Sequence, residues 1–341
     1  MRKTLAFILF LAAVPASAGW KFNSWTVYWE NDNFGYGRKS DRFYTNGVRI
    51  TAQFSDPTVV NWRWVSGVRD WTWNHFGGDT TVVPVASVTT IFGQNFYTPQ
   101  DITIPTPQPL DRPWAGVLYA GLSESITDPD LHQMHIVELN AGILGPGAGA
   151  QRVQKFVHND LGFSNHDPSG WSNQLKNEPV LSLRYQQIRR VPLLVRGDTD
   201  VLDVVPEFGA QLGSPQTFAN AGAVVRLGYH ITGLPIGIIP GAAAPSAVHR
   251  IELYVFGGGE ARYVPFNATL DGGLFNNGPE ANQPERFVRD LRVGVSARYK
   301  KVRLTYTVVA RSAEFHVPAG AIENQRFGSF ALTIEPFTGF K

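Results

Sequence analysis

Apolar and polar residues alternate with period two along much of the chain, the pattern of β-strands that face two different environments. In the first such segment Trp25, Val27 and Trp29 share one face, and in the second Val48 and Ile50 do the same. A sheet with one apolar and one polar face suits a wall with lipid on one side and water on the other.

The alternation predicts an all-β fold, a transmembrane antiparallel β-barrel of about 12 strands. A tight turn at Lys300-Lys301 has the length of a periplasmic turn, whereas long polar connections around 31–43, 98–113, 145–177 and 264–285 are expected at the extracellular end. The expected strands lie near 21–31, 43–55, 86–97, 114–126, 132–144, 178–190, 201–213, 218–231, 248–263, 286–299, 301–312 and 327–337.

One long connection is predicted to contain a short helix. Residues 150–161 carry apolar side chains at helical spacing, among them Val153 and Val157. Gln154 and His158 are four residues apart, so they share one face of this helix.

The N-terminus predicts export of the protein. Two basic residues precede an apolar run from Leu5 to Val14, and the small residues Ala16-Ser17-Ala18 follow. This run is shorter than the ~20 residues of a membrane-spanning helix, so residues 1–18 are expected to be a removed signal peptide. Residues 19–341 then form a single outer-membrane barrel domain.

Composition agrees with a barrel but leaves one alternative open. The formal net charge of +2 becomes zero without the two basic signal residues, which gives no bias toward nucleic acid. The chain has no cysteine, and its nine Trp, 22 Phe and 11 Tyr favour the aromatic girdles of a barrel. A soluble β-sandwich is the alternative that composition allows.

His158 is the best candidate for a catalytic residue. The pKa of an unperturbed histidine suits a general base at neutral pH. The alternative is a histidine that only bonds a neighbouring loop. His166 could form a metal pair with it, but the spacing matches no compact zinc motif.

The end of the first strand offers oxygen ligands. Asn31 and Asp32 stand there, and Thr45 begins the second strand. Carboxylate, amide and carbonyl oxygens suit Ca²⁺, although an Asx-type turn that caps the strand end explains the same residues. The acidic spacing excludes an EF-hand.

Two further motifs were weighed. Asp111-Arg112 precedes the fourth strand and is either a structural salt bridge or an anchor for an anionic head group. Gly145-x-Gly147-x-x-Ala150 imitates a dinucleotide fingerprint, but the alternating segment before it and the absence of a βαβ unit argue against one. There is no Gly-x-Ser-x-Gly elbow of a serine hydrolase.

Together, several motifs in order along the chain resemble the outer-membrane lipid A 3′-O-deacylase family. They span essentially the whole chain after the signal, and the segments that carry the resemblance are Glu30–Phe34, Asp41–Gly47, Asp111–Tyr119, Gln154–His158, Gly170–Leu175, Glu314–Phe315 and Arg326–Ser329. The resemblance implies a twelve-stranded barrel with its active site at the outer leaflet, between the wall and a helical extracellular loop.

The resemblance also implies a Ca²⁺-dependent esterase that removes the 3′-linked acyloxyacyl group from lipid A. The functional residues of the family fall on Asn31, Asp32, Thr45 and His158. The family has an acidic residue six positions after the histidine, where this chain has Ser164.

The mechanism expected from these residues has His158 as general base, with Asp32 and Asn31 at the Ca²⁺ ion. Asn31 and Thr45 orient water or substrate, and Gln154 fixes the imidazole.

Three cations are candidate partners of the substrate phosphates: Arg38, Lys39 and Arg112. The expected partners are lipopolysaccharide and the lipids of the outer membrane, with no nucleic acid and a monomeric barrel. Two alternatives remain: a non-enzymatic porin or structural barrel, and a phospholipase on the same barrel.

Overall fold

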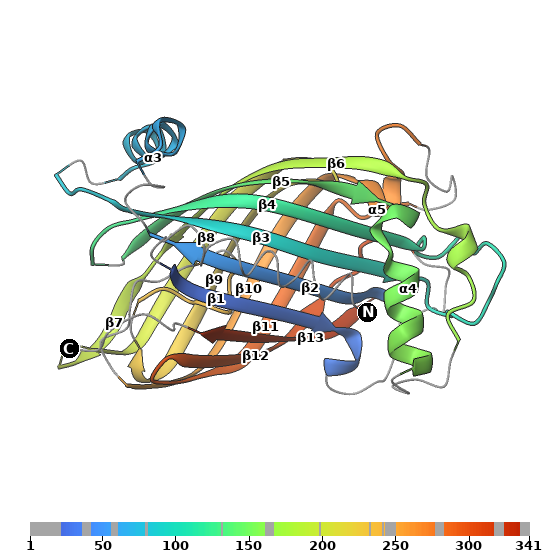
Figure 1. Ribbon diagram of the computed structural model, residues 1–341. Coiled ribbons are helices and arrows are strands. Elements are labelled where there is room, and N and C mark those ends of the chain that lie inside the picture. Colours follow the sequence, from blue (N-terminus) through green and yellow to red (C-terminus); the bar gives the residue numbers. More distant parts are fainter. Residues whose placement is uncertain are drawn as a thin grey trace.

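The computed structural model is a long antiparallel β-barrel, with helices at both ends (Figure 1). The structure describes residues 22–35, 42–55, 61–78, 81–130, 132–160, 167–197, 199–231, 233–240, 242, 250–276, 283–316 and 324–334. The expected signal peptide over 1–18 lies outside these residues.

Strands that follow one another in the sequence pair in the sheet, except β6 and β7, which both pair with β8; β13 pairs with β1. The strands are β1 (Phe22–Asn31), β2 (Phe43–Phe54), β3 (Val85–Thr98), β4 (Ala115–Thr127), β5 (Gln133–Leu144), β6 (Glu178–Arg189), β7 (Val191–Arg196), β8 (Thr199–Gly213), β9 (Gln216–Ile231), β10 (Ile251–Asn267), β11 (Phe287–Tyr299), β12 (Val302–Arg311) and β13 (Gln325–Ile334). The pairing of β6 with β8 closes the barrel, and β7 extends β6 along β8 past Arg190. The predicted all-β barrel of 12 strands is confirmed.

The outer face of the wall is apolar. Leu139, Leu181, Leu212 and Leu291 are each more than half exposed there. An exposed leucine on every second position of a barrel strand is a lipid-facing residue. The register confirms the predicted shared face of the first two strands, since Trp29 lies opposite Val48.

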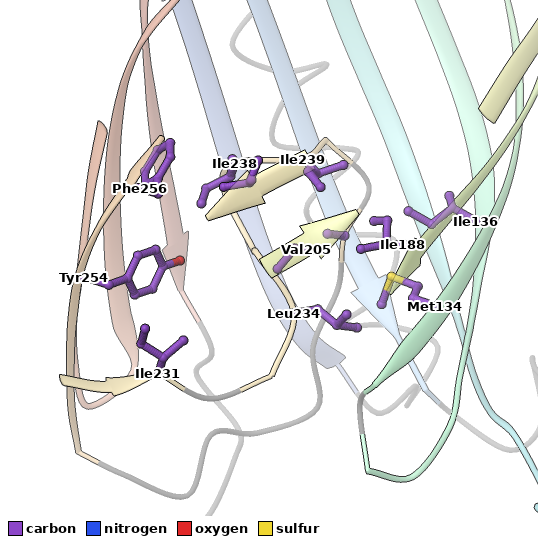
Figure 2. Close-up of a cluster of buried hydrophobic side chains, with 12 residues drawn as sticks. Met134, Ile136, Ile188, Val205, Ile231, Leu234, Ile238, Ile239, Tyr254 and Phe256 are labelled. Carbon is purple, nitrogen blue, oxygen red and sulfur yellow. The ribbon is translucent and has the colours of Figure 1, made fainter. Parts of the chain in front are cut away.

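Side chains and one inserted segment occupy part of the lumen. Ion pairs such as Arg49–Glu138, with 2.7 Å between Nη2 and Oε2, join strands on the inner side. After β9 the chain enters the barrel, where Leu234 and Ile238 belong to a buried apolar cluster with Phe256 (Figure 2). No element was predicted from the sequence for this inserted segment.

Helical segments lie at both ends. The helical bounds are η1 (Asp32–Phe34), α3 (Arg63–His75), η2 (Pro146–Ala148), α4 (Ala150–Lys155), η3 (Phe156–Asp160), η4 (Trp171–Asn173) and α5 (Ala268–Asp271). The helix predicted over 150–161 is present as α4 and the π-helical η3, whereas α3 was not predicted from the sequence. Within the described residues, no helix has both the length and the apolar character needed to cross a membrane.

Candidate active site

A β-bulge turns polar residues of β2 to the outer side of the wall. The register of β2 on β3 shifts between Tyr44 and Asn46, so Thr45 is the additional residue. Tyr44 faces the lumen, where its hydroxyl donates to Glu30 Oε2 at 2.5 Å. Thr45 and Asn46 therefore both lie on the outer face. Bulges of this kind often re-aim side chains beside active sites.

Gly47 makes the bulge possible. A Cβ atom at this position would lie 1.8 Å from the hydroxyl oxygen of Tyr44. Only a residue without a side chain leaves room for the Tyr44 ring to fold back along its own strand.

Asn31, at the end of β1, joins the outer-face group. Its amide nitrogen donates to Asn46 Oδ1 at 3.3 Å, and the same oxygen accepts from the indole of Trp29 at 2.9 Å. Asn31 Oδ1 accepts from the backbone N–H of Asn33 at 2.8 Å, which caps η1. The capping turn considered as an alternative for Asn31 is thus present. The Asn31 side chain both caps η1 and bonds Asn46.

Asp32 and Thr45 complete a set of oxygen groups. Asp32 is 1% exposed, and its Oδ2 accepts from the backbone N–H of Arg42 at 2.7 Å. The hydroxyls of Thr45 and Thr98 lie 2.7 Å apart. One carboxylate with amide and hydroxyl oxygens is a donor set that fits Ca²⁺. No group of three His, Cys, Asp or Glu suited to a metal occurs in the described ranges, so a site here would also use neutral oxygens.

Close packing fixes the start of α4 on the outer side of β3 and β4. A Cβ atom at Gly116 would lie 2.6 Å from that of Ala150, so a larger residue would push the helix away. Gln94 on β3 donates from Nε2 to the carbonyl oxygen of Ala148 at 2.6 Å, just before the helix.

The helix buries its polar face. Gln154 is 1% and His158 is 4% exposed, while Val153 is 37% exposed. The predicted shared face of Gln154 and His158 is confirmed, and it faces the protein. His158 stands in the π-helical turn of η3, a local geometry that is frequent at functional sites.

Gln154 is held by an aromatic side chain. Its Oε1 accepts from the indole N–H of Trp171 at 2.7 Å, and Trp171 packs on Trp114 with ring centroids 4.9 Å apart. The Nε2 of Gln154 is buried and finds no hydrogen-bond partner among the described residues.

Strand β3 links the two groups of residues. Phe96 on this strand contacts Trp171, with ring centroids 6.3 Å apart, and Thr98, two residues on, bonds Thr45. In Figure 1 the end of β1 and the start of β2 lie at the same end of the barrel as α4. The fold therefore brings the helix and the strand-end residues to one end and one face.

Three residues of this site were not singled out from the sequence: Asn46, Thr98 and Trp171. Asn46 and Trp171 stand inside the family-like segments, so a signal was present for them. Arg38 and Lys39, the predicted phosphate partners, lie outside the described residues, as do Ser164 and His166.

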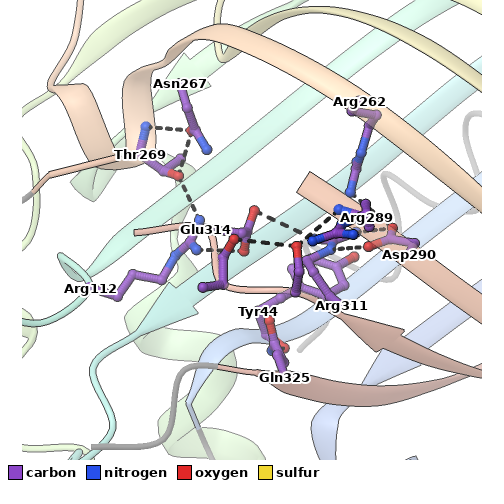
Figure 3. Close-up of polar contacts among 12 residues, drawn as sticks. Tyr44, Arg112, Arg262, Asn267, Thr269, Arg289, Asp290, Arg311, Glu314 and Gln325 are labelled. Atoms are coloured by element: carbon purple, nitrogen blue, oxygen red, sulfur yellow. Dashed lines mark hydrogen bonds and ion pairs between the residues drawn. The ribbon is translucent and has the colours of Figure 1, made fainter. Parts of the chain in front are cut away.

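Arg112 lies elsewhere, on the lumen side of the barrel. It is 0% exposed, and its guanidinium donates to Glu314 Oε2 at 2.7 Å and to Thr269 Oγ1 at 2.9 Å (Figure 3). The guanidinium also stacks over the ring of Tyr97 at 4.4 Å. This is the structural salt bridge that was weighed against a head-group role, with Glu314 in place of Asp111 as its partner. Arg112 thereby ties three extracellular connections together.

Two guanidinium groups set the charge of Glu314. Burial acts to raise the pKa of this carboxyl, but Arg112 and Arg311 hold the pKa below its ordinary value of 4.5. The carboxylate is therefore the stable form at neutral pH, and the ion pair persists there.

A family model described as outer membrane protein LpxR matches residues 5–335. The chain belongs to the LpxR family. The structure of LpxR from Salmonella typhimurium is similar, with a TM-score of 0.68 over 92% of this chain and 99% of that chain, at 20% sequence identity. The family resemblance drawn from the motifs is confirmed, and with it the location in the bacterial outer membrane.

More distant likenesses concern other barrels. The β-domain of the Bordetella autotransporter BrkA gives a TM-score of 0.43 at 9% identity, over 93% of this chain and 99% of that chain. The translocator domain of the autotransporter NalP from Neisseria meningitidis gives 0.41 at 9% identity, over 98% and 96%. No curated protein sequence matches the chain.

Proposed function

We propose that this LpxR-family protein hydrolyses the ester that links the 3′ acyloxyacyl group to lipid A, at the outer leaflet. The observation that carries the proposal is a cluster of polar side chains on the lipid-facing side of the wall, at the end of the barrel that carries α4. Asn31, Thr45 and Asn46 belong to it. Polar groups on a lipid-facing surface are unfavourable, so their presence favours a functional site.

His158 is the general base of the proposed reaction. It removes a proton from a water molecule, and the resulting hydroxide attacks the ester carbonyl carbon. The bond between this carbon and the 3′ oxygen of lipid A then breaks, and the protonated His158 returns the proton to that oxygen, which releases a carboxylic acid and an alcohol. Histidine is a common general base because its unperturbed pKa lies near neutral pH. His158 is buried on the protein-facing side of the helical segment, and this burial keeps bulk water away from the reacting ester.

Side chains around the base orient the reactants. Asn31 and Thr45 hold water or substrate by hydrogen bonds from the end of the wall. Gln154 positions His158 from one helical turn before it. The Trp171 indole N–H holds the Gln154 carbonyl oxygen, so the Nε2 of Gln154 is left to donate to a group other than Trp171.

Asp32 and Asn31 are the residues we assign to Ca²⁺, with neutral oxygens beside them. A Ca²⁺ ion held there would supply Lewis-acid polarisation of the ester carbonyl and stabilisation of negative charge on its oxygen. The buried Asp32 carboxylate supplies the anionic ligand that a hard cation requires.

An aromatic strip next to the site suits the acyl chains. Trp29 and Phe34 lie 4.8 Å apart between ring centroids, Phe34 and Phe330 lie 5.2 Å apart, and Tyr306 continues the row. Trp29 is 44% exposed. This strip begins at Trp29, two residues before Asn31. An acyl chain that lies along the strip therefore places its ester at the polar cluster. Arg38 and Lys39 remain our candidates for the lipid A phosphates.

The test is mass spectrometry of lipid A incubated with refolded protein in detergent, with Ca²⁺ or with chelator. Calcium-dependent loss of one acyloxyacyl unit is the expected result, and it would make Ser164 a tolerated difference. Intact lipid A from a folded barrel would overturn the proposal. Release of fatty acid from phospholipid alone would assign the site to a phospholipase instead.

A porin is the rival from another class. The apolar cluster of Leu234, Ile238 and Phe256 lies inside the barrel, which argues against an open pore. Conductance steps in planar bilayers, together with intact lipid A, would support the rival.

A further inference from the structure

Helix α3 takes no part in the function proposed above, and it has three distinct faces. Val65, Thr72 and Trp73 form a buried face, since they are 0%, 0% and 3% exposed. Trp64 and Trp71 are seven residues apart and share an exposed face, at 54% and 56%.

The third face is polar. Arg63, Asp70 and Asn74 recur at spacings of seven and four residues, which places them together on the helix, and all three are exposed. A helix with one buried, one aromatic and one polar face is built for contact with protein, with lipid and with water at once.

The buried face lies on the outside of the barrel, over β4 to β6. Trp73 meets the edge of His135 with ring centroids 5.6 Å apart, and Phe76 stacks on Tyr185 at 4.4 Å. Gln133 donates from Nε2 to the backbone carbonyl of Gly77 at 3.3 Å. These contacts fix α3 at the end of the barrel opposite to α4 (Figure 1).

The wall changes character where α3 covers it. Leu122 and Leu139 point outward and are 43% and 51% exposed, as lipid-facing residues are. Further along the same outward rows, Glu124, two residues after Leu122, is 5% exposed, and His135, four residues before Leu139, is 0% exposed. Both are covered by α3 and the residues after it. A carboxyl and an imidazole on the outward face mark the level at which the apolar belt ends.

The direction of α3 fits this level. In Figure 1 the barrel axis runs across the view while α3 is seen end-on, so the helix lies across the barrel axis. A barrel spans the bilayer along its axis, and a helix that crosses this axis lies in the plane of the membrane surface.

We infer that α3 is an interfacial helix that binds the phospholipid head-group region of the periplasmic leaflet, with Trp64 and Trp71 among the lipids. Indole rings prefer this region because they combine an apolar body with a polar N–H. The polar face with Asp70 and Asn74 turns to the periplasm. The choice of lipid over a protein partner rests on the position of α3 on the wall, at the level where the exposed leucine rows of β4 and β5 end.

The absence of cysteine from the sequence allows a direct test. Trp64→Cys and, as the matched control on the polar face, Asn74→Cys are each labelled with an environment-sensitive fluorophore. The labelled proteins are refolded into vesicles of phosphatidylethanolamine and phosphatidylglycerol. Quenching is then measured with a lipid that carries a nitroxide near the head group, and with aqueous iodide.

The inference predicts blue-shifted emission and quenching by the nitroxide lipid for the label at 64. The label at 74 should emit as in water and be quenched by iodide. Equal iodide quenching at both positions would overturn the inference and leave the aromatic face to a periplasmic protein. Heat-modifiable migration in gels verifies that both variants are folded. The outcome is independent of lipid A hydrolysis.

Discussion

The two faces of the barrel wall use polar residues differently at the extracellular end. Glu30 and Tyr44 point into the lumen and bond each other, while their chain neighbours Asn31 and Thr45 point outward. Lumen groups such as these pair with groups of other strands, whereas the outward groups lie at the end of the barrel that also carries α4 and its histidine. The lumen network stabilises the barrel, and the outer cluster is available for chemistry.

This contrast predicts that substitutions on the two faces affect different properties. Changes on the outer face should alter hydrolysis and leave the unfolding temperature nearly unchanged. Changes in the lumen network should lower stability first. The following experiments test this separation, beginning with the largest expected effect.

His158→Ala should lower the rate of lipid A hydrolysis by about 10²–10⁴-fold, because a general base contributes that much. The barrel should keep its heat-modifiable migration, since no wall residue is changed. Val153→Ala, on the exposed face of the same helix, is the matched control and should retain activity. Wild-type activity in His158→Ala would remove this residue from the mechanism.

Arg112→Met should lower the free energy of unfolding by about 3 kcal/mol, because Glu314 keeps its buried charge without its main partner. Arg286→Met is the control, since its ion pair with Asp271 is 40% exposed at the arginine and should contribute less than about 1 kcal/mol. Thermal unfolding followed by gel migration measures both. Equal losses would mean that burial does not distinguish the two pairs.

Asp32→Asn should weaken the Ca²⁺ dependence of hydrolysis by about 10–100-fold, the range seen when groups that support a metal site are changed. The measurement is the Ca²⁺ concentration at half-maximal rate. Asp70→Asn, at the opposite end of the barrel, should leave this concentration unchanged. An unaltered titration in Asp32→Asn would remove Asp32 from the ion.

Acidification should weaken the lumen network through Glu314. Its folded pKa lies below the unfolded value of 4.5 because of Arg112 and Arg311, against the effect of burial. Its contribution to stability is therefore fully present above the unfolded pKa and is lost as the pH falls through the folded pKa. The stability difference between wild type and Glu314→Gln should shrink below about pH 4.5. A constant difference from pH 7 to pH 3 would contradict this assignment.

Trp171→Phe should give the smallest effect. The ring still packs on Trp114, and only the hydrogen bond to Gln154 is lost, which is about 1 kcal/mol. If Gln154 positions the base, kcat should fall several-fold with little change in KM. An equal change in KM would place Trp171 in substrate binding instead.

The strands were largely predictable from the sequence. Alternation gave β11 and β12 within a residue at the turn around Lys300, because lipid and water demand opposite side chains at successive positions. Gln154 and His158 were placed on one helical face by spacing alone. The family-like segments contained Asn46 and Trp171 without indicating their contacts.

Other features depend on contacts between distant residues. The partner of Arg112 is Glu314, 202 residues away, so its neighbour Asp111 was the only candidate visible from local sequence. The bulge at Thr45 arises because Tyr44 folds over Gly47, which a strict period-two pattern does not represent. Helix α3 combines three faces rather than two, and this weakens the simple amphipathic signal.

The sequence by itself determined the barrel, its twelve strands and the family, because a membrane imposes one rule on every strand: apolar outward, polar inward. Only the tertiary structure decided which polar residues are exceptions to that rule. Asn31 and Thr45 lie on the outward side through strand alternation and the bulge after Tyr44, and Glu124 lies outward beneath α3, which covers it. Shielding by a distant helix is a property of the folded wall, and no local pattern of residues contains it.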